Sequence, residues 1–296
     1  KQLIEVGSVN LNGYLSATPT RVVTNSQINT QLGSANLNIA LDDLNDSKFA
    51  SYKGKIKFIR FNLGRLLDNS SLGYATFSLN VDGLGFSQET LNTQIDGTIN
   101  QLQFNGYTYN KIKVSGKLDA PVFNGKLISN DPNFQFEFNG LADISDDNNI
   151  YDFKANVKYA DLHALNFVER DTLSIMKGDI LMNMKGKNLD DVSGSLYLQN
   201  FSYKNQDNLF EFEELELTSS FDNQVRTITI NSPDVISGEV EGIFQVNQVP
   251  ALFQNAVGSL YTNYDPIPTE GSQYLDFNFD IYNKIVEVFF PNIELA

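Results

Sequence analysis

Residues 134–140 read Phe-Gln-Phe-Glu-Phe-Asn-Gly, so three phenylalanines alternate with polar side chains. A β-strand sends successive side chains to opposite faces, and this stretch therefore describes a ribbon with one apolar and one polar face. Such alternation is typical of antiparallel sheets, whereas strands of buried parallel sheets are apolar throughout. The stretch predicts an antiparallel strand with a single apolar face.

The same period of two recurs along the chain, about every 8 to 12 residues, which indicates an all-β protein. It picks out one apolar set, whose members we expect to share one face of a sheet: Phe77, Leu79, Val81, Ile95, Ile99, Ile112, Val114, Leu118, Phe134, Phe136, Phe138, Ile180, Met182, Met184, Leu196, Leu198, Phe210, Phe212, Ile228, Ile230, Val240, Phe244, Val246, Phe277, Phe279 and Ile281.

Asn-Gly and Asp-Gly dipeptides favour the tight turns of β-hairpins. We therefore place turns at the five dipeptides that separate or border the alternating runs: Asn12-Gly13, Asp82-Gly83, Asn105-Gly106, Asn124-Gly125 and Asn139-Gly140. With this spacing the chain would form roughly twenty or more short strands. The apolar register changes between Phe212 and Leu215, which predicts a bulge or a strand break at the two intervening glutamates.

A second pattern, apolar-x-Gly-x-apolar, occurs in four strand-like units centred on Gly97, Gly116, Gly194 and Gly238. Glycine within a strand costs stability, so its repeated use predicts tight curvature or a close approach of backbones. The repeat favours one array over several unrelated domains. We treat residues 1–296 as one repetitive region without an internal boundary, and we expect it to be a fragment of a longer chain.

Helix is scarce in the predicted structure. The best candidate is Pro250 to Tyr261, where apolar residues recur at helical spacing after an early proline. A weaker candidate is Asp161 to Phe167. Two short helices cannot cover the apolar faces of so many strands. Either the sheet closes on itself as a sandwich or barrel, or its apolar face serves another purpose.

The composition removes several function classes. The 36 acidic and 21 basic side chains give a net charge of −15, which argues against nucleic acid as a partner because phosphate binding needs clustered cations. The chain has no Cys and a single His, so disulfide scaffolds, thiol chemistry and His- or Cys-rich metal sites are excluded. No apolar run approaches the roughly 18 to 20 residues of a membrane helix.

Candidate catalytic groups are few, and none forms a recognisable site. His163 is the only imidazole, and we expect it to be a surface residue on a short helix or loop. The carboxylate pairs Asp42/Asp43, Asp146/Asp147 and Asp190/Asp191 fall in predicted turns, where solvated acidic residues are common. The stretch from Asp143 to Asn149 lacks the ligand spacing of a calcium loop. We therefore predict no enzyme activity, no metal and no cofactor.

Two interpretations of the apolar stripe remain open at this point. The first is an ordinary closed hydrophobic core, since most alternating sheets bury one face. The second is a groove for acyl chains, because burial contributes about 0.8 kcal/mol per CH₂.

Residues 95–144 carry a family resemblance through five features: Tyr107 and Tyr109 beside a turn, Ile112-x-Val114-x-Gly116, Phe123-x-Gly125-x-Leu127, Asn130-Asp131-Pro132-Asn133, and Phe136-x-Phe138-x-Gly140. This pattern resembles the repeat of the TamB family, in the AsmA-like superfamily of bacterial envelope proteins. Residues 178–203 and 236–264 resemble further units of the same kind.

The resemblance implies a long sheet bent into a U, called a β-taco, with apolar side chains inside and polar ones outside. It implies a protein of the Gram-negative periplasm that is anchored in the inner membrane by a helix outside this chain. Such proteins are associated with phospholipid transport to the outer membrane. The TamB family also works with a BamA-like outer-membrane barrel of the TamA type in the assembly of outer-membrane proteins. The implied partners of this chain are therefore phospholipid acyl chains.

On this interpretation the apolar set lines a lipid groove, and Phe136→Arg or Leu198→Arg would block lipid passage with a modest effect on folding. The competing hypothesis is a closed β-sandwich or adhesin-like repeat that binds protein or glycan. It predicts exposed tyrosine platforms, for which the candidates are Tyr107, Tyr109, Tyr261 and Tyr264.

Overall fold

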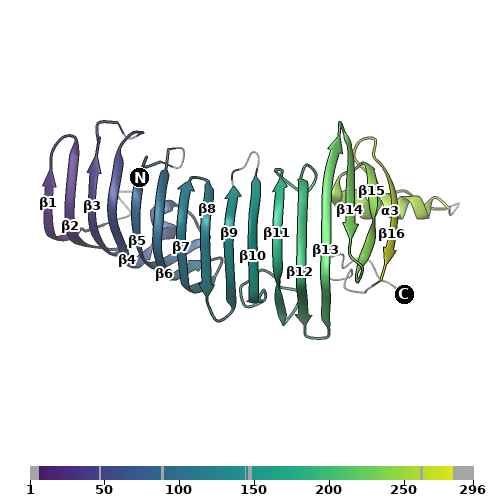
Figure 1. Cartoon of the computed structure of the whole chain (residues 1–296). Helices are drawn as coiled ribbons and strands as arrows, with labels where there is room; N and C mark the ends of the chain where they lie inside the picture. Colours follow the sequence, from purple (N-terminus) through teal and green to yellow (C-terminus); the bar gives the residue numbers. More distant parts are fainter. Residues whose placement is uncertain are drawn as a thin grey trace.

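All the described strands belong to one antiparallel sheet in which each strand pairs with its neighbours in sequence. The computed structural model describes residues 7–46, 48–87, 90–143, 145, 149–260 and 263–282. Within these ranges the sheet has 16 strands, in the order β1 to β16 without a crossover (Figure 1). The predicted all-β class is confirmed.

The elements have the following bounds: β1 Asn10–Ala17, β2 Arg21–Thr30, β3 Gly33–Asp42, β4 Ser51–Asn62, α2 Leu63–Leu67, β5 Leu72–Leu84, β6 Asn92–Phe104, β7 Tyr107–Asp119, β8 Val122–Asn130, β9 Phe134–Asp143, β10 Ile150–Asp161, β11 Ser174–Lys185, β12 Ser193–Asn205, β13 Leu209–Asp222, β14 Val225–Asn231, β15 Ile236–Ile243, the 3₁₀ turn η1 Val246–Gln248, α3 Val249–Gly258 and β16 Tyr274–Ile281.

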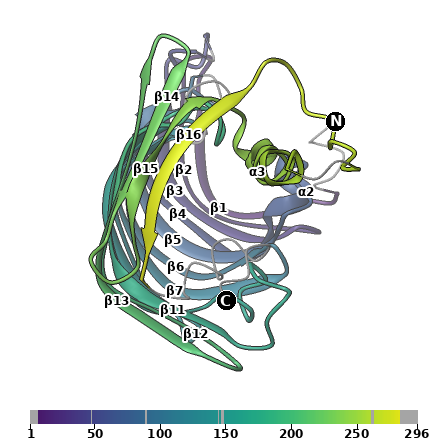
Figure 2. The same ribbon diagram turned by 90° about the vertical axis from the view of Figure 1, so that its right-hand side faces the viewer.

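The strands bend along their length, so that the sheet, seen along its long axis, has the section of an open U (Figure 2). Its first and last strands do not pair with each other. Neighbouring strands lie about 4.8 Å apart, so sixteen of them extend over about 70 Å. The elongated, U-shaped groove expected from the sequence is confirmed, and the alternative of a closed sandwich is wrong.

The predicted number of strands, roughly twenty or more, is wrong for the described residues, because four of the five proposed turns lie inside strands. Gly13 belongs to β1, Gly83 to β5, Gly125 to β8 and Gly140 to β9. Only Asn105-Gly106 connects two strands, β6 and β7. The strands are accordingly longer than expected, reaching 13 or 14 residues in β5, β6, β7, β12 and β13.

The mid-strand glycines allow neighbouring backbones to approach closely, as the repeat pattern predicts. A Cβ atom on Gly97 would lie 2.2 Å from the carbonyl oxygen of Ser78 on β5. A Cβ atom on Gly116 would lie 2.6 Å from the Cα atom of its cross-strand partner Gly125. Both distances are too short for a real side chain. The close approach of these strands therefore requires glycine at these positions.

The change of register in β13 occurs within a continuous strand, and the pairing of β13 with β12 keeps one register on both sides of this point. Phe212 and Leu215 are both buried on one face, at 5% and 8% exposure, and Glu213 and Glu214 between them are exposed. On β12, Asn200 adopts the left-handed conformation, with φ of 48°. Asn200 and Glu213 are skipped together between the pairs Gln199–Glu214 and Phe201–Phe212, so both strands change face here without a bulge between them. The prediction of a bulge or a strand break at the two glutamates is wrong.

The helical predictions have mixed outcomes. Helix α3 agrees with the candidate at Pro250 to Tyr261, although Tyr261 lies outside the described residues. The weaker candidate, Asp161 to Phe167, is wrong: β10 includes Asp161, and turns follow it. The side chain of Asp161 caps such a turn by accepting a hydrogen bond from the backbone N–H of Ala164. Helix α2 was not predicted, because its five residues are too few for a periodic signal.

Candidate functional site

The concave face of the sheet is apolar. Cross-strand partners point to the same side, and the rows formed by the pairing are hydrophobic: Phe77 pairs with Ile99, and Ile99 with Ile112. Helix α2 packs Leu63 and Leu66 against the cluster that contains Phe58 of this face. Because α2 and α3 lie within the U, the apolar rows line its inside (Figure 2). We call this surface the inner face.

The outer face is polar and carries surface ion pairs. Glu137 lies between Lys126 and Lys158, at 3.9 and 2.9 Å, and these lysines, Lys158 most strongly, lower the pKa of its carboxyl group. Lys53 and Asp82 form another pair, at 2.6 Å. Exposed ion pairs of this kind stabilise a fold by only about 0–1 kcal/mol each. They place charged groups on the outer face of the sheet.

When the register is followed across all described strands, the inner face carries one charged side chain, Arg226 of β14. Arg226 is only 3% exposed. Its guanidinium donates to the carbonyl oxygens of Leu189 and Val192, at 2.7 and 3.1 Å, and to Oγ of Ser219 at 2.9 Å. Burial lowers the pKa of Arg226, and nearby Asp190 and Asp191 oppose that effect. These bonds fasten the β11–β12 connection to the inner face, so Arg226 is held as a structural clamp.

Three segments cover part of the inner face along one edge, which lies at the bottom of Figure 1 and which we call the lower edge. Helix α2, between β4 and β5, closes the first cluster, around Leu32 and Phe61. The β10–β11 connection closes the second with Leu165, which has no exposed surface. Val235, between β14 and β15, is 1% exposed and belongs to the third. The sheet thus has a true hydrophobic core beside this edge.

Most members of the predicted apolar set are half-buried, as expected for the wall of an open groove. Val114, Phe138, Leu198, Phe212 and Phe244 are buried at 5–8% exposure. The exposed members are Phe277 and Ile281, both on the last described strand.

Two members of the set are not in the sheet, which corrects the expectation for them. Strand β15 ends at Ile243, so Phe244 follows the strand and Val246 begins η1. The expectation that arginine at Phe136 or Leu198 would leave folding nearly intact does not fit their contacts. Leu198 is part of the third cluster, and Phe136 packs against the second.

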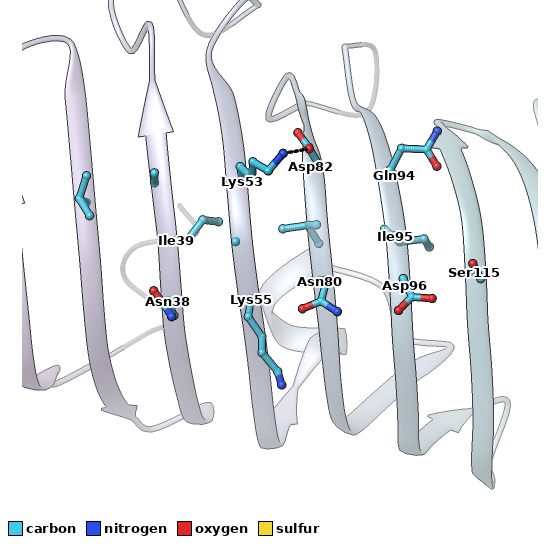
Figure 3. A pocket seen from close by; sticks show the side chains of 14 residues that line it. Asn38, Ile39, Lys53, Lys55, Asn80, Asp82, Gln94, Ile95, Asp96 and Ser115 are labelled. Carbon is cyan, nitrogen blue, oxygen red and sulfur yellow. Dashed lines mark hydrogen bonds and ion pairs between the residues drawn. The ribbon is translucent and has the colours of Figure 1, made fainter.

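Two hollows lie on the polar outer face. The larger, of about 680 Å³, crosses β3 to β7 between Lys53, Lys55, Asp82 and Asp96, whose positions along neighbouring strands Figure 3 shows. The smaller, of about 390 Å³, lies beside Lys177, Asn200 of β12 and Glu213 of β13. Lysine and aspartate are balanced in the larger hollow, and Lys53 is paired with Asp82.

The predicted catalytic candidates are dispersed. His163 is exposed, and its Nδ1 lies 3.1 Å from the carbonyl oxygen of Val168. Asp42 pairs with Arg21 at 3.2 Å. Asp190 accepts a hydrogen bond from the backbone N–H of Val246 at 2.6 Å, and Asp191 accepts one from that of Asn188 at 2.8 Å. These contacts hold loops together.

The remaining acidic candidates do not change this picture. Asp43, at the end of β3, adopts a left-handed conformation with φ of 58°. The pair Asp146/Asp147 lies outside the described residues. In the part of the chain that the structure describes, no three His, Asp or Glu side chains are grouped closely enough to hold a metal ion.

The tyrosine candidates do not form an exposed platform. Tyr109 is 6% exposed, and the ring of Tyr107 meets it edge-on at 4.8 Å between centroids. Tyr264 donates a hydrogen bond to Asn255 on α3. Tyr261 lies outside the described residues. The sequence pattern did not predict the role of Tyr107, whose hydroxyl donates a hydrogen bond to the buried carboxylate of Asp131.

No protein family, curated protein or solved structure matches this chain. Among the described residues, no helix combines the length and apolar content of a membrane span. The resemblance to the TamB family is therefore carried by the sequence pattern.

Proposed function

We propose that this chain carries phospholipid acyl chains along the inner face of its sheet. The observation that supports the proposal is the one-sided chemistry of the sheet, which is maintained in register from strand to strand. The row of Leu79, Gly97 and Val114 continues through apolar residues as far as Leu215 on β13. Along the order of the described strands, the first charged side chain of the inner face is Arg226 on β14, in another row. Exposed apolar surfaces of such extent mark binding sites for apolar ligands or partners.

The energetics suit a carrier rather than a tight binder. Moving a lipid chain from a bilayer into water costs about 0.8 kcal/mol of free energy for each CH₂ group that becomes exposed. Contact with a half-buried apolar wall recovers part of this loss. Because the described strands β1 to β13 place no charged side chain on the inner face, this wall offers no fixed anchor for a headgroup, and a lipid can move along it.

The length of the sheet supports a place in a bridge between two membranes. About 70 Å of ladder, extended by further repeats, would cover a substantial distance. With the family resemblance, this leads us to propose a segment of a periplasm-spanning, inner-membrane-anchored protein of a Gram-negative bacterium. In that setting it would deliver phospholipid to the outer membrane and support outer-membrane protein assembly with a TamA-type barrel. We propose no enzymatic step for it.

Lipid retention by the purified protein tests the proposal. The protein is incubated with vesicles of phosphatidylethanolamine and phosphatidylglycerol, separated from them, extracted and analysed by mass spectrometry. Leu118→Arg places a cation on the inner face. Lys117→Arg is the control, because it retains the cation that the neighbouring residue already presents on the outer face. We expect Leu118→Arg to lower the retained lipid several-fold and Lys117→Arg to leave it unchanged. If the wild-type chain retains no phospholipid, the proposal is wrong.

A further inference from the structure

The three hydrophobic clusters cover only the part of the inner face that lies near the lower edge. Leu162 and Leu165 of the β10–β11 connection pack with Tyr109, Phe134 and Phe136, which lie at or near the lower-edge ends of their strands. Asn166 of the same connection donates to the carbonyl oxygen of Asn105 at 2.9 Å, two hairpins away. This segment therefore runs along the edge and seals it.

Nearer the opposite, upper edge, none of the three clusters formed by the described residues covers the inner face of β6 to β11. We call this strip the upper lane. It is lined by half-buried side chains that belong to none of the three clusters: Ile95, Leu118, Phe123, Phe153, Met182 and Met184. At strand spacing, β6 to β11 span about 24 Å.

The chemistry of the upper lane suits a fluid hydrocarbon. Gly116, Gly125 and Gly140 occupy one row on three consecutive strands. The ring of Phe138, below this row, lies near those of Phe123 and Phe153, with centroids 6.2 and 5.0 Å apart.

Two of the chain's three methionines complete the lane at β11, and methionine side chains adapt to irregular apolar partners. The strands of the lane pair with neighbours on both sides, so their backbone offers no free edge for a peptide strand. A hydrocarbon chain needs neither hydrogen bonds nor a fixed register, and it is the occupant that this surface fits.

Building on the proposed function, we infer that acyl chains bind in the upper lane with their headgroups at the upper edge, and that the lower half of the inner face is structural core. The polarity of the lipid sets this orientation. A headgroup at the lower edge would be buried against the three clusters without polar partners, which is costly. At the upper edge, beside the two-residue β7–β8 connection Ala120-Pro121, the headgroup would stay in contact with water.

Site-specific photocrosslinking tests this inference. Benzoylphenylalanine is placed singly at Ile95, Leu118 and Met182 in the lane, at Ile112 and Phe136 in the covered half, and at Lys113 on the outer face. Each variant is checked for folding by circular dichroism, incubated with phosphatidylethanolamine and phosphatidylglycerol vesicles, and irradiated. We expect lipid adducts at the lane positions to exceed those at Ile112, Phe136 and Lys113 by several-fold. Ile112 keeps the comparison valid if the Phe136 variant does not fold.

The outcomes separate the inference from the proposed function. Equal adducts across the lane and the covered half would overturn the division of the inner face while leaving lipid carriage standing. Adducts at no inner position would overturn both. With a phospholipid whose headgroup is photoreactive, we expect crosslinks to the upper-edge residues Ala120 and Pro121 rather than to Asn105 and Gly106 at the lower edge. The reverse pattern would refute the orientation.

Discussion

The phenolic oxygen of Tyr107 lies 2.5 Å from Oδ1 of Asp131, a carboxylate with no exposed surface. Oδ2 of the same carboxylate accepts hydrogen bonds from the backbone and side-chain nitrogens of Asn110, at 2.8 and 3.0 Å. The backbone N–H of Asn133 donates to Oδ1 at 2.8 Å. The Asn130-Asp131-Pro132-Asn133 turn is thereby joined to β7.

Removing the Tyr107 hydroxyl should weaken the fold measurably. Tyr107→Phe deletes one donor to a buried carboxylate, and hydrogen bonds to charged groups contribute about 1.5–3 kcal/mol. We expect the free energy of unfolding to fall by that amount in urea titrations at neutral pH. Tyr14→Phe, at an exposed residue of β1, is the control and should change stability little. A Tyr107→Phe variant as stable as the wild type would contradict this role.

The same tyrosine predicts a loss of stability at alkaline pH. Burial, and then its hydrogen bond to Asp131, raise the pKa of Tyr107 to about 12. A group whose pKa is raised on folding stabilises the fold below its unfolded pKa of about 10. That stabilisation is lost as the pH rises towards 12. The Tyr107→Phe variant should therefore lose less stability between pH 10 and 12 than the wild type, as measured by urea unfolding at each pH.

Truncation of aromatic residues should distinguish the covered half of the inner face from the upper lane. Phe212 is 5% exposed and stacks on Phe201 at 4.8 Å, so Phe212→Ala should cost about 3–5 kcal/mol. Phe153 is half-buried in the lane, and Phe153→Ala should cost about 1 kcal/mol. Chemical denaturation of the two variants measures the difference. Equal losses would mean that the whole inner face is core.

The sequence alone predicts the class of the sheet and the membership of its inner face well, because strand periodicity depends only on alternation. Prediction from the sequence fails where the same residue type fits two different local structures. Asn124-Gly125 and Asn139-Gly140 have the composition of hairpin turns, yet both lie inside strands where a neighbouring backbone leaves no room for a Cβ. Likewise, periodicity assigns Phe136 and Met182 to the same apolar face and does not distinguish them. Leu165 belongs to the cluster that packs against Phe136 and not to one that includes Met182, and the local sequence around the two residues does not show this.

Adding a methyl group to the glycine row should damage the sheet. A Cβ atom on Gly116 would lie 2.5 Å from the carbonyl oxygen of Asn124, and no flexible side chain is there to yield. Overpacking of this kind costs about 1–3 kcal/mol. We expect Gly116→Ala to lower the unfolding midpoint accordingly. Ser115→Ala, at the next position and on the outer face, should have little effect. A Gly116→Ala variant as stable as Ser115→Ala would show that the close approach is not required.

The Arg226 clamp predicts a local as well as a global effect. Arg226→Met keeps much of the side-chain length but removes the donors to the carbonyl oxygens of Leu189 and Val192, of which the Val192 oxygen keeps a hydrogen bond from Ser219. Hydrogen bonds to charged groups contribute about 1.5–3 kcal/mol, so we expect a loss of about 2–4 kcal/mol in unfolding free energy. Hydrogen exchange should also accelerate in residues 186–192, because the guanidinium fastens that connection to β14. If exchange there is unchanged while stability falls, Arg226 stabilises the strands without holding the connection.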